Sequence, residues 1–288
     1  MAAPERTPPR GVLVARAGFA AVVLASGVSG LALLALPGAT DRFFSWGLAP
    51  PPLASLVGGL YVASAVTFSI ALRLPWRGVR SLVAASVALS APTLLATVVH
   101  RDVFDFGRWQ AWAWVMLFTA APPFWAGLLV ANRSLAPRRQ ARAGRAAVAG
   151  LLALALACGA AGLLLWIDPE AGSRVVPFRP SPLGGRFLGS WMGFLGVMAA
   201  WTALRPAEAR LCLVALAIYP AGAFAAGLRS FADLSPPAGR WAYLVLLAGM
   251  SLVFGTALMR TWTPRTDLVE SGGSGGAQPQ SWPPDAPQ

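Results

Sequence analysis

Residues Arg133–Arg145 read RSLAPRRQARAGR and divide the chain into two long apolar halves. Five of these 13 residues are arginine. Loops that carry an excess of arginine between apolar spans stay on the cytoplasmic side of a membrane. This one stretch therefore predicts both where the two halves meet and which side of a bilayer the central loop occupies.

The composition indicates a membrane protein. The chain has 288 residues, of which 56% are hydrophobic and only 12% are charged, whereas soluble domains carry about 25% charged residues. Because so small a share of charged residues cannot cover the surface of a soluble protein of this size, most of the chain must face lipid. The net charge of +12 resides on arginines in short loops, which sets orientation and gives no reason to expect nucleic-acid binding.

Eight apolar spans of 18–23 residues follow one another along the chain. None contains Asp, Glu, Lys or Arg, and a helix of this length crosses a hydrocarbon core of about 30 Å. Helix is the state that satisfies every backbone polar group in lipid, so we predict an all-α polytopic protein with eight transmembrane helices. The predicted spans are residues 17–36, 53–72, 81–99, 110–132, 146–167, 187–204, 211–228 and 241–259.

The arginine distribution predicts that both termini are cytoplasmic. With a cytoplasmic N-terminus, 15 arginines fall in the inner segments and 8 in the outer ones, as the positive-inside rule requires. The expected organisation is a disordered N-terminus, a first four-helix repeat, an arginine-rich linker, a second four-helix repeat and a disordered tail. These segments are residues 1–16, 17–132, 133–145, 146–260 and 261–288.

The repeat is predicted from loop residues that recur at a nearly constant offset. Pro37, Ala39, Arg42 and Pro50 recur 132 residues later, Asp102 recurs at Asp233 with an offset of 131, and Gly-Arg-Trp at 107–109 recurs at 239–241. Apolar composition does not force these loop matches. Each half has four spans, so both halves enter and leave on one face, which predicts two parallel repeats related by an axis along the membrane normal.

The polar residues of the outer loops are the candidate site residues. His100 beside Asp102 is a candidate for acid–base chemistry or cation binding, but only the aspartate recurs, at Asp233. We therefore expect each aspartate to be held by an arginine or by loop amides as a structural contact. The candidates on this face are Arg42, His100, Asp102, Arg108, Arg174, Asp233 and Arg240.

No catalytic, cofactor or metal site is predicted, and no cofactor is expected. His100 is the only histidine, which leaves too few ligands for a haem or zinc site. Cys158 and Cys212 lie inside apolar spans, so we expect two buried thiols rather than a disulfide.

Two patterns inside the spans concern helix breaks and helix packing. Pro92 and Pro220 fall in corresponding spans of the two halves, and breaks at corresponding positions are a pointer to a transporter site. Gly189 and Gly193 form a GxxxG pattern, and Gly59 with Ala63 forms a small-xxx-small pair. Such patterns let helices approach closely, and we expect them to be used within the chain.

Several segments resemble uncharacterised multi-pass membrane proteins of high-GC Gram-positive bacteria. The resemblance is carried mainly by the first half, in Pro50–Leu53, Gly58–Tyr61, Thr97–Phe104 and Trp112–Trp114. It implies residence in the bacterial cytoplasmic membrane, and it implies no activity.

Three functions stay open at this point. A transporter or permease would have a cavity between the halves lined by Ser, Thr, Tyr and Arg. A structural or regulatory partner of a membrane complex, or a homo-oligomer, would have a filled interface and a small-residue face toward lipid. A lipid-modifying enzyme would bring His100, Asp102 and Arg42 together on the outer face.

Overall fold

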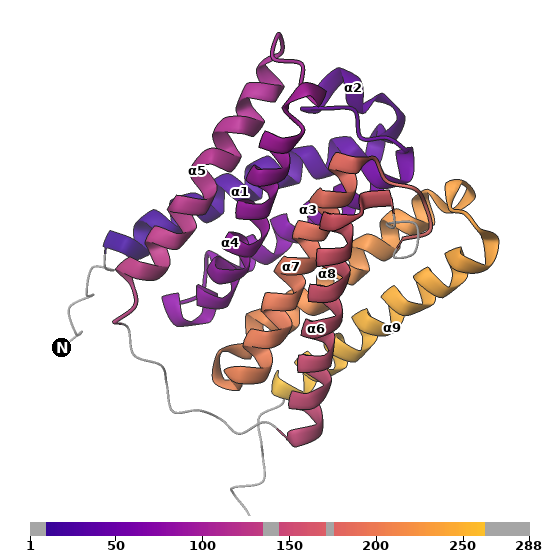
Figure 1. Ribbon diagram of the computed structural model, residues 1–288. Coiled ribbons are helices and arrows are strands. Elements are labelled where there is room, and N and C mark those ends of the chain that lie inside the picture. Colours follow the sequence, from indigo (N-terminus) through magenta and orange to yellow (C-terminus); the bar gives the residue numbers. More distant parts are fainter. Residues whose placement is uncertain (1–9, 135–143, 171–175, 263–288) are drawn as a thin grey trace, which may run out of the picture.

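The computed structural model describes residues 10–134, 144–170 and 176–262, and within these ranges every regular element is helical (Figure 1). Eight long helices are joined by one short helix, α2 (Thr40–Phe43), and by 3-10 turns, among them η2 (Arg101–Val103) and η5 (Phe231–Asp233). The long helices are α1 (Arg10–Ala35), α3 (Pro51–Ala71), α4 (Trp76–Val99), α5 (Trp109–Ala131), α6 (Arg145–Ile167), α7 (Pro182–Leu204), α8 (Ala209–Arg229) and α9 (Pro237–Trp262).

All eight helices are long and apolar enough to cross a bilayer, which confirms the predicted all-α, eight-span class. Every long helix begins before its predicted span, by one to seven residues, and α1 and α7 are two examples. Helix α1 begins at Arg10, so residues 10–16, expected in a disordered N-terminus, are helical; arginines are good helix formers and extend into the interface. Helix α7 begins at Pro182, where the Ser181 side chain accepts a hydrogen bond from the Gly184 amide and Pro occupies the first turn.

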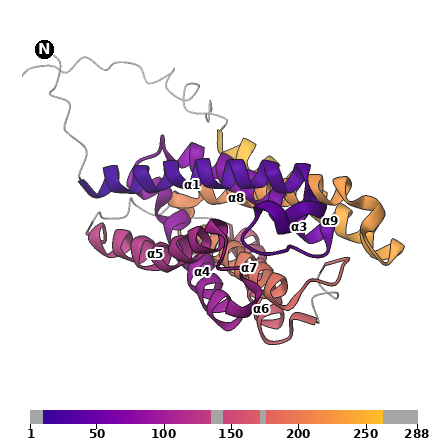
Figure 2. The ribbon, with the colours of Figure 1, turned by 90° about the horizontal axis from the view of Figure 1, so that it is seen from above.

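The helices form two layers of four, and each layer takes two helices from each half of the sequence (Figure 2). Contacts run α1–α3–α8–α9 in one layer and α5–α4–α7–α6 in the other. The two halves are therefore interleaved, and the helices that join them are the central members α3, α8, α4 and α7. We call the end of the bundle at which α1 begins the near face, and the opposite end the far face.

Burial separates central helices from peripheral ones. Helices α3, α7 and α8 are mostly buried, whereas few residues of α9 are buried, and α9 presents Val245, Leu252 and Val253 outward. An outer surface this apolar is suited to lipid rather than water. The fold is thus that of an integral membrane protein with the central helices shielded from lipid.

Glycines set the closest helix crossings. A Cβ on Gly58 would lie 3.0 Å from the Gly30 carbonyl oxygen of α1, and a Cβ on Gly189 would lie 2.7 Å from that of Gly162 in α6. A Cβ on Gly59 would lie only 2.2 Å from the Gly222 oxygen in α8. The expectation that these small residues pack helices within the chain is confirmed.

The prolines interrupt no helix. Pro92 lies inside α4 and Pro220 inside α8, and both helices continue across them. The pair Pro122-Pro123 lies likewise within α5. The corresponding prolines therefore do not create the broken helices from which transporter sites are commonly built.

Candidate functional site

The most polar contact between the two halves lies at the far face and joins His100 to Arg186. His100 caps the C-terminus of α4, and Arg186 lies in the first turns of α7. The Arg186 Nη1 group contacts His100 Nε2. Arginine only donates hydrogen bonds, so His100 accepts through Nε2 and is neutral in this contact.

Arg186 is also tied to the end of α6. Its Nε donates to the carbonyl oxygen of Trp166 at 3.1 Å, one of the carbonyls that a helix C-terminus leaves without an intrahelical partner. The guanidinium carbon lies 5.9 Å from the centre of the Trp166 ring. One half-buried arginine thus connects the far-face ends of α4, α6 and α7.

The electrostatic surroundings of His100 favour its neutral form. Partial burial and the positive charge of Arg186 lower the pKa of His100, and Asp102 opposes this shift. Protonation of His100 would place two cations in contact and remove the acceptor that Arg186 uses. The contact therefore belongs to the neutral histidine.

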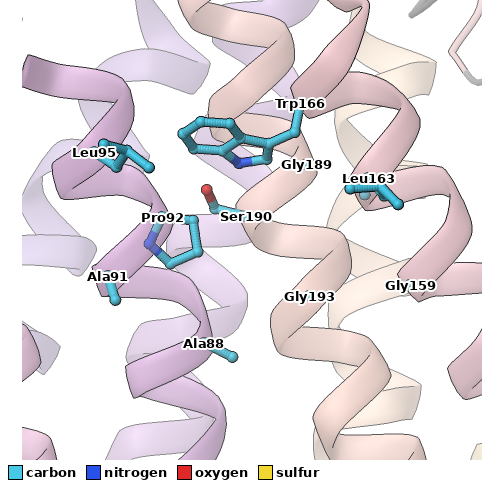
Figure 3. A pocket seen from close by; sticks show the side chains of 11 residues that line it. Ala88, Ala91, Pro92, Leu95, Gly159, Leu163, Trp166, Gly189, Ser190 and Gly193 are labelled. Atoms are coloured by element: carbon cyan, nitrogen blue, oxygen red, sulfur yellow. The ribbon is translucent and has the colours of Figure 1, made fainter. Parts of the chain in front are cut away.

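A groove of about 490 Å³ lies below this contact, between α4, α6 and α7 (Figure 3). Its walls carry the exposed side chains of Leu95 and Leu163, so it opens sideways where the bilayer's hydrocarbon would be. Its floor is the α7 stretch from Gly189 through Ser190 to Gly193. Small residues on α7 and α6 leave this space because they have little side chain to fill it.

Trp166 covers the far-face end of the groove. Figure 3 shows its indole ring above Ser190, with the nitrogen on the side of the groove. The buried Trp166 Nε1 finds no hydrogen-bond partner among the described residues. The lining of the groove is therefore mostly apolar, and the Arg186 guanidinium lies beside Trp166 at its far-face end.

The two predicted arginines of the Gly-Arg-Trp repeats bind backbone rather than aspartate. Arg108 donates through Nη1 to the Asp41 carbonyl oxygen. Arg240 donates to the Phe231 carbonyl oxygen at 3.3 Å and lies 4.9 Å above the Phe231 ring. Both arginines hold far-face turns in place, which is a structural role.

The prediction that an arginine or loop amides hold Asp102 and Asp233 is wrong. Asp102 and Asp233 are both exposed, and neither carboxylate accepts a hydrogen bond from the residues that the structure describes. The two also occupy different places: Asp102 is the second residue of η2, whereas Asp233 is the third residue of η5. The residue that corresponds to Asp102 in the structure is therefore Ala232, one position before Asp233.

The remaining candidates do not assemble a reactive site. Arg42 is exposed on α2, and no contact among the described residues joins it to His100 or Asp102. Arg174 lies outside the described residues. Within those residues, no three His, Cys, Asp or Glu side chains gather as metal ligands would. The enzyme hypothesis thus lacks the convergent outer site that it requires.

The contacts between the two halves, which we call the seam, comprise α3 against α8, α4 against α7 and α4 against α8. In the seam Ser64 and Tyr219 hydroxyls share a 3.0 Å hydrogen bond, and Ser230 donates to Ser55 at 2.8 Å. Tyr219 also packs against the fully buried Trp191. These serine and tyrosine hydroxyls therefore find partners across the seam, whereas the buried Trp191 Nε1 has none among the described residues.

Both cysteines are free and buried, as expected. Cys212 is fully buried on α8, one of the helices that form the seam. Cys158 lies on α6, close to the backbone of Gly196 in α7. Cys212 thus reports directly on whether the seam stays closed.

The sequence analysis did not predict a cluster of Trp201, Arg205 and Glu208 at the near face. Glu208 is buried and accepts a 3.0 Å hydrogen bond from Trp201 Nε1, while Arg205 lies 4.9 Å above the Trp201 ring. These three residues come from one tight connection between α7 and α8. Their pairing follows from the path of the chain rather than from a spacing pattern.

Arg186 was also missed as a site residue, although a signal was available. It directly precedes the predicted span that begins at residue 187, where an arginine sits at the membrane boundary rather than in an outer loop. Its pairing with His100 could be seen only in the three-dimensional structure.

The chain matches no known family, no curated protein and no solved structure, so the site stands on its geometry alone.

Proposed function

We propose that the protein is a non-catalytic structural or regulatory component of the bacterial cytoplasmic membrane, made of two parallel four-helix repeats with both termini in the cytoplasm. The observation that carries this function is the closed seam. Gly59 and Gly222 bring the backbones of α3 and α8 into direct contact, and Tyr219, Trp191 and Phe187 fill the space beside them. A transporter needs the halves to part around a substrate, and this packing opposes that movement.

The repeat is supported by contacts that recur in pairs. The crossing of Gly30 with Gly58 has its counterpart in Gly162 with Gly189, at offsets of 132 and 131. The contact of α3 with α8 likewise corresponds to that of α7 with α4. A two-fold rotation that exchanges the two halves accounts for both observations.

The direction of the axis is supported by α4 and α8, which carry Ser81 and Cys212 at an offset of 131. These two helices pack against each other. Two equivalent helices that pack against each other lie beside a two-fold axis. Helices α4 and α8 both run from the near face to the far face, so the axis that exchanges them lies along the bundle, and thus along the membrane normal.

The orientation rests on the arginine bias, which makes the near face cytoplasmic. The bacterial origin rests on the sequence resemblance. The non-catalytic role rests on the exposed, separate positions of Asp102, Asp233 and Arg42. The small-residue face toward lipid that we expect of such a component is present in the groove between α4, α6 and α7.

Thiol labelling of Cys212 tests the closed seam. In a Cys158→Ser variant Cys212 is the only thiol, and a small maleimide added to membranes should leave it unmodified until detergent denaturation. Ser134→Cys in a variant without both native cysteines provides an exposed control. Labelling of Cys212 in native membranes at a rate near that of the control would reject the closed seam and favour transport.

A further inference from the structure

We propose that the groove between α4, α6 and α7 binds one anionic phospholipid, with an acyl chain along Gly189, Ser190 and Gly193 and its phosphate at Arg186. This site goes beyond the proposed function and does not depend on it.

The depth of the site suits a lipid. Arg186, Trp166 and His100 lie at the far-face ends of three membrane-spanning helices, the height at which headgroups meet hydrocarbon. Ser190 lies one helical turn deeper on the same face of α7 as Arg186. A molecule that fills the groove must therefore be apolar along Gly193 and polar at Arg186.

The polar end suits a phosphate. A guanidinium has five N–H donors, and the protein contacts of Arg186 engage its Nε with Trp166 and its Nη1 with His100. Arg186 forms no ion pair with a described carboxylate. Arginine binds phosphate oxygens through paired N–H groups, and the remaining donors of Arg186 are available for this contact.

Trp166 lies between the groove and Arg186. Its Nε1, like those of Trp46, Trp76 and Trp191, has no hydrogen-bond partner among the described residues, and its ring lies over the groove beside Ser190 (Figure 3). A buried donor that is left unsatisfied costs free energy, and a phosphate or ester oxygen at this end of the groove would accept from it. The occupant therefore needs acceptor oxygens next to its chain, as phospholipids have.

The corresponding crossing in the other half is closed. Ala91 and Ser190 of the groove correspond to Gly222 and Gly59 at an offset of 131. Those two glycines bring α3 and α8 into backbone contact. The same architecture thus packs without a groove when glycine occupies both positions, and the open groove reflects the residues present at Ala91 and Ser190.

Arg229 provides the matched control for Arg186. It donates to the carbonyl oxygens of Leu34 at 2.6 Å and Ala35 at 3.3 Å, and Leu34 corresponds to Trp166 at an offset of 132. Both arginines therefore satisfy the C-terminal carbonyls of equivalent helices at the same face. Of the two, Arg186 contacts Trp166 and Ser190, which line the groove, so only its loss should affect lipid binding.

Native mass spectrometry of the delipidated protein tests the site, with phosphatidylglycerol and phosphatidylcholine of identical chains as probes. Wild type should bind one phosphatidylglycerol at least ten-fold more tightly than phosphatidylcholine. Arg186→Gln should lose this preference, and Arg229→Gln should keep it. Gly193→Leu, which fills the floor of the groove, should weaken both lipids, whereas Gly127→Leu on α5 should not.

Further arms fix the location and the source of the phosphate. Phosphatidylglycerol with a photoreactive acyl chain should crosslink wild type within residues 88–95, 159–166 or 189–193, a readout that needs no variant. Soluble glycerol phosphate should not compete with it. Equal weakening by Arg186→Gln and Arg229→Gln, crosslinks confined to other helices, or effective competition by glycerol phosphate would each overturn the proposal.

Discussion

The contact between Gly59 and Gly222 predicts a large response to the smallest possible substitution. In Gly59→Ala the new Cβ would lie 2.2 Å from the Gly222 oxygen, 2.8 Å from its carbonyl carbon and 3.1 Å from the Ala226 side chain. Non-bonded atoms prefer about 3.5–4.0 Å, so α3 and α8 must separate by roughly 1 Å. Overpacking of this kind costs about 1–3 kcal/mol.

A matched substitution isolates that cost from helix propensity. Gly127 lies inside α5, and a Cβ there would meet nothing within 4 Å. Replacing glycine by alanine inside a helix is favourable by about 0.5–1 kcal/mol, and this gain applies to both variants. The free energy of unfolding should therefore be lower in Gly59→Ala than in Gly127→Ala by the packing cost alone, about 1–3 kcal/mol.

Denaturant-induced unfolding in detergent micelles measures this difference. Gly222→Ala should resemble Gly59→Ala, and the double variant should cost less than the sum, because helices that one methyl has separated resist the second less. Equal stability of Gly59→Ala and Gly127→Ala would refute the direct backbone contact and, with it, the closed seam.

Three further outcomes are expected. Tyr219→Phe removes the hydrogen bond to Ser64 and should lower the free energy of unfolding in micelles by about 0.5–1.5 kcal/mol; an unchanged value would contradict the buried bond. Because the pKa of His100 is lowered in the folded protein, its contribution to stability is present above about pH 6.5 and is lost as the pH falls below that value, so wild type should lose more thermal stability between pH 7.5 and 5 than His100→Gln, and equal losses would refute this. Reporters fused after Arg139 and after Asp105 should report the cytoplasm and the exterior, respectively, and the reverse at either position would contradict the orientation.

The eight helices could be predicted because each span is long and free of charge, and lipid leaves helix as the usable backbone state. The arrangement of those helices could not. A leucine that faces lipid, such as Leu246, and one that is buried, such as Leu244, are equally compatible with a membrane span, so hydrophobic periodicity does not indicate which face packs. The two mixed layers follow from glycine crossings whose partners are far apart in sequence.

The candidate site was predicted only in part, for a related reason. His100 was identified because a lone histidine beside carboxylates is conspicuous, but its partner Arg186 is 86 residues away in another helix. Asp102 and Asp233 were matched by identity, and the structure places them at different positions of η2 and η5. A match in residue type between two loops therefore does not establish that the two residues make the same contact.

The far face shows how two similar halves come to differ in chemistry. Ser55 and Arg186 are 131 residues apart, and Ser230 and His100, the C-caps of α8 and α4, are 130 apart. One pair forms a hydroxyl–hydroxyl bond, and the other forms the guanidinium–imidazole contact. Both join an α3- or α7-type helix to the end of its neighbour across the seam, so the fold needs a hydrogen bond there and either pair supplies it. The serine pair is buried, whereas Arg186 of the charged pair lies beside Trp166, which lines the open groove. Because an arginine is not needed to make the bond across the seam, an anion held in the groove would account for its presence there.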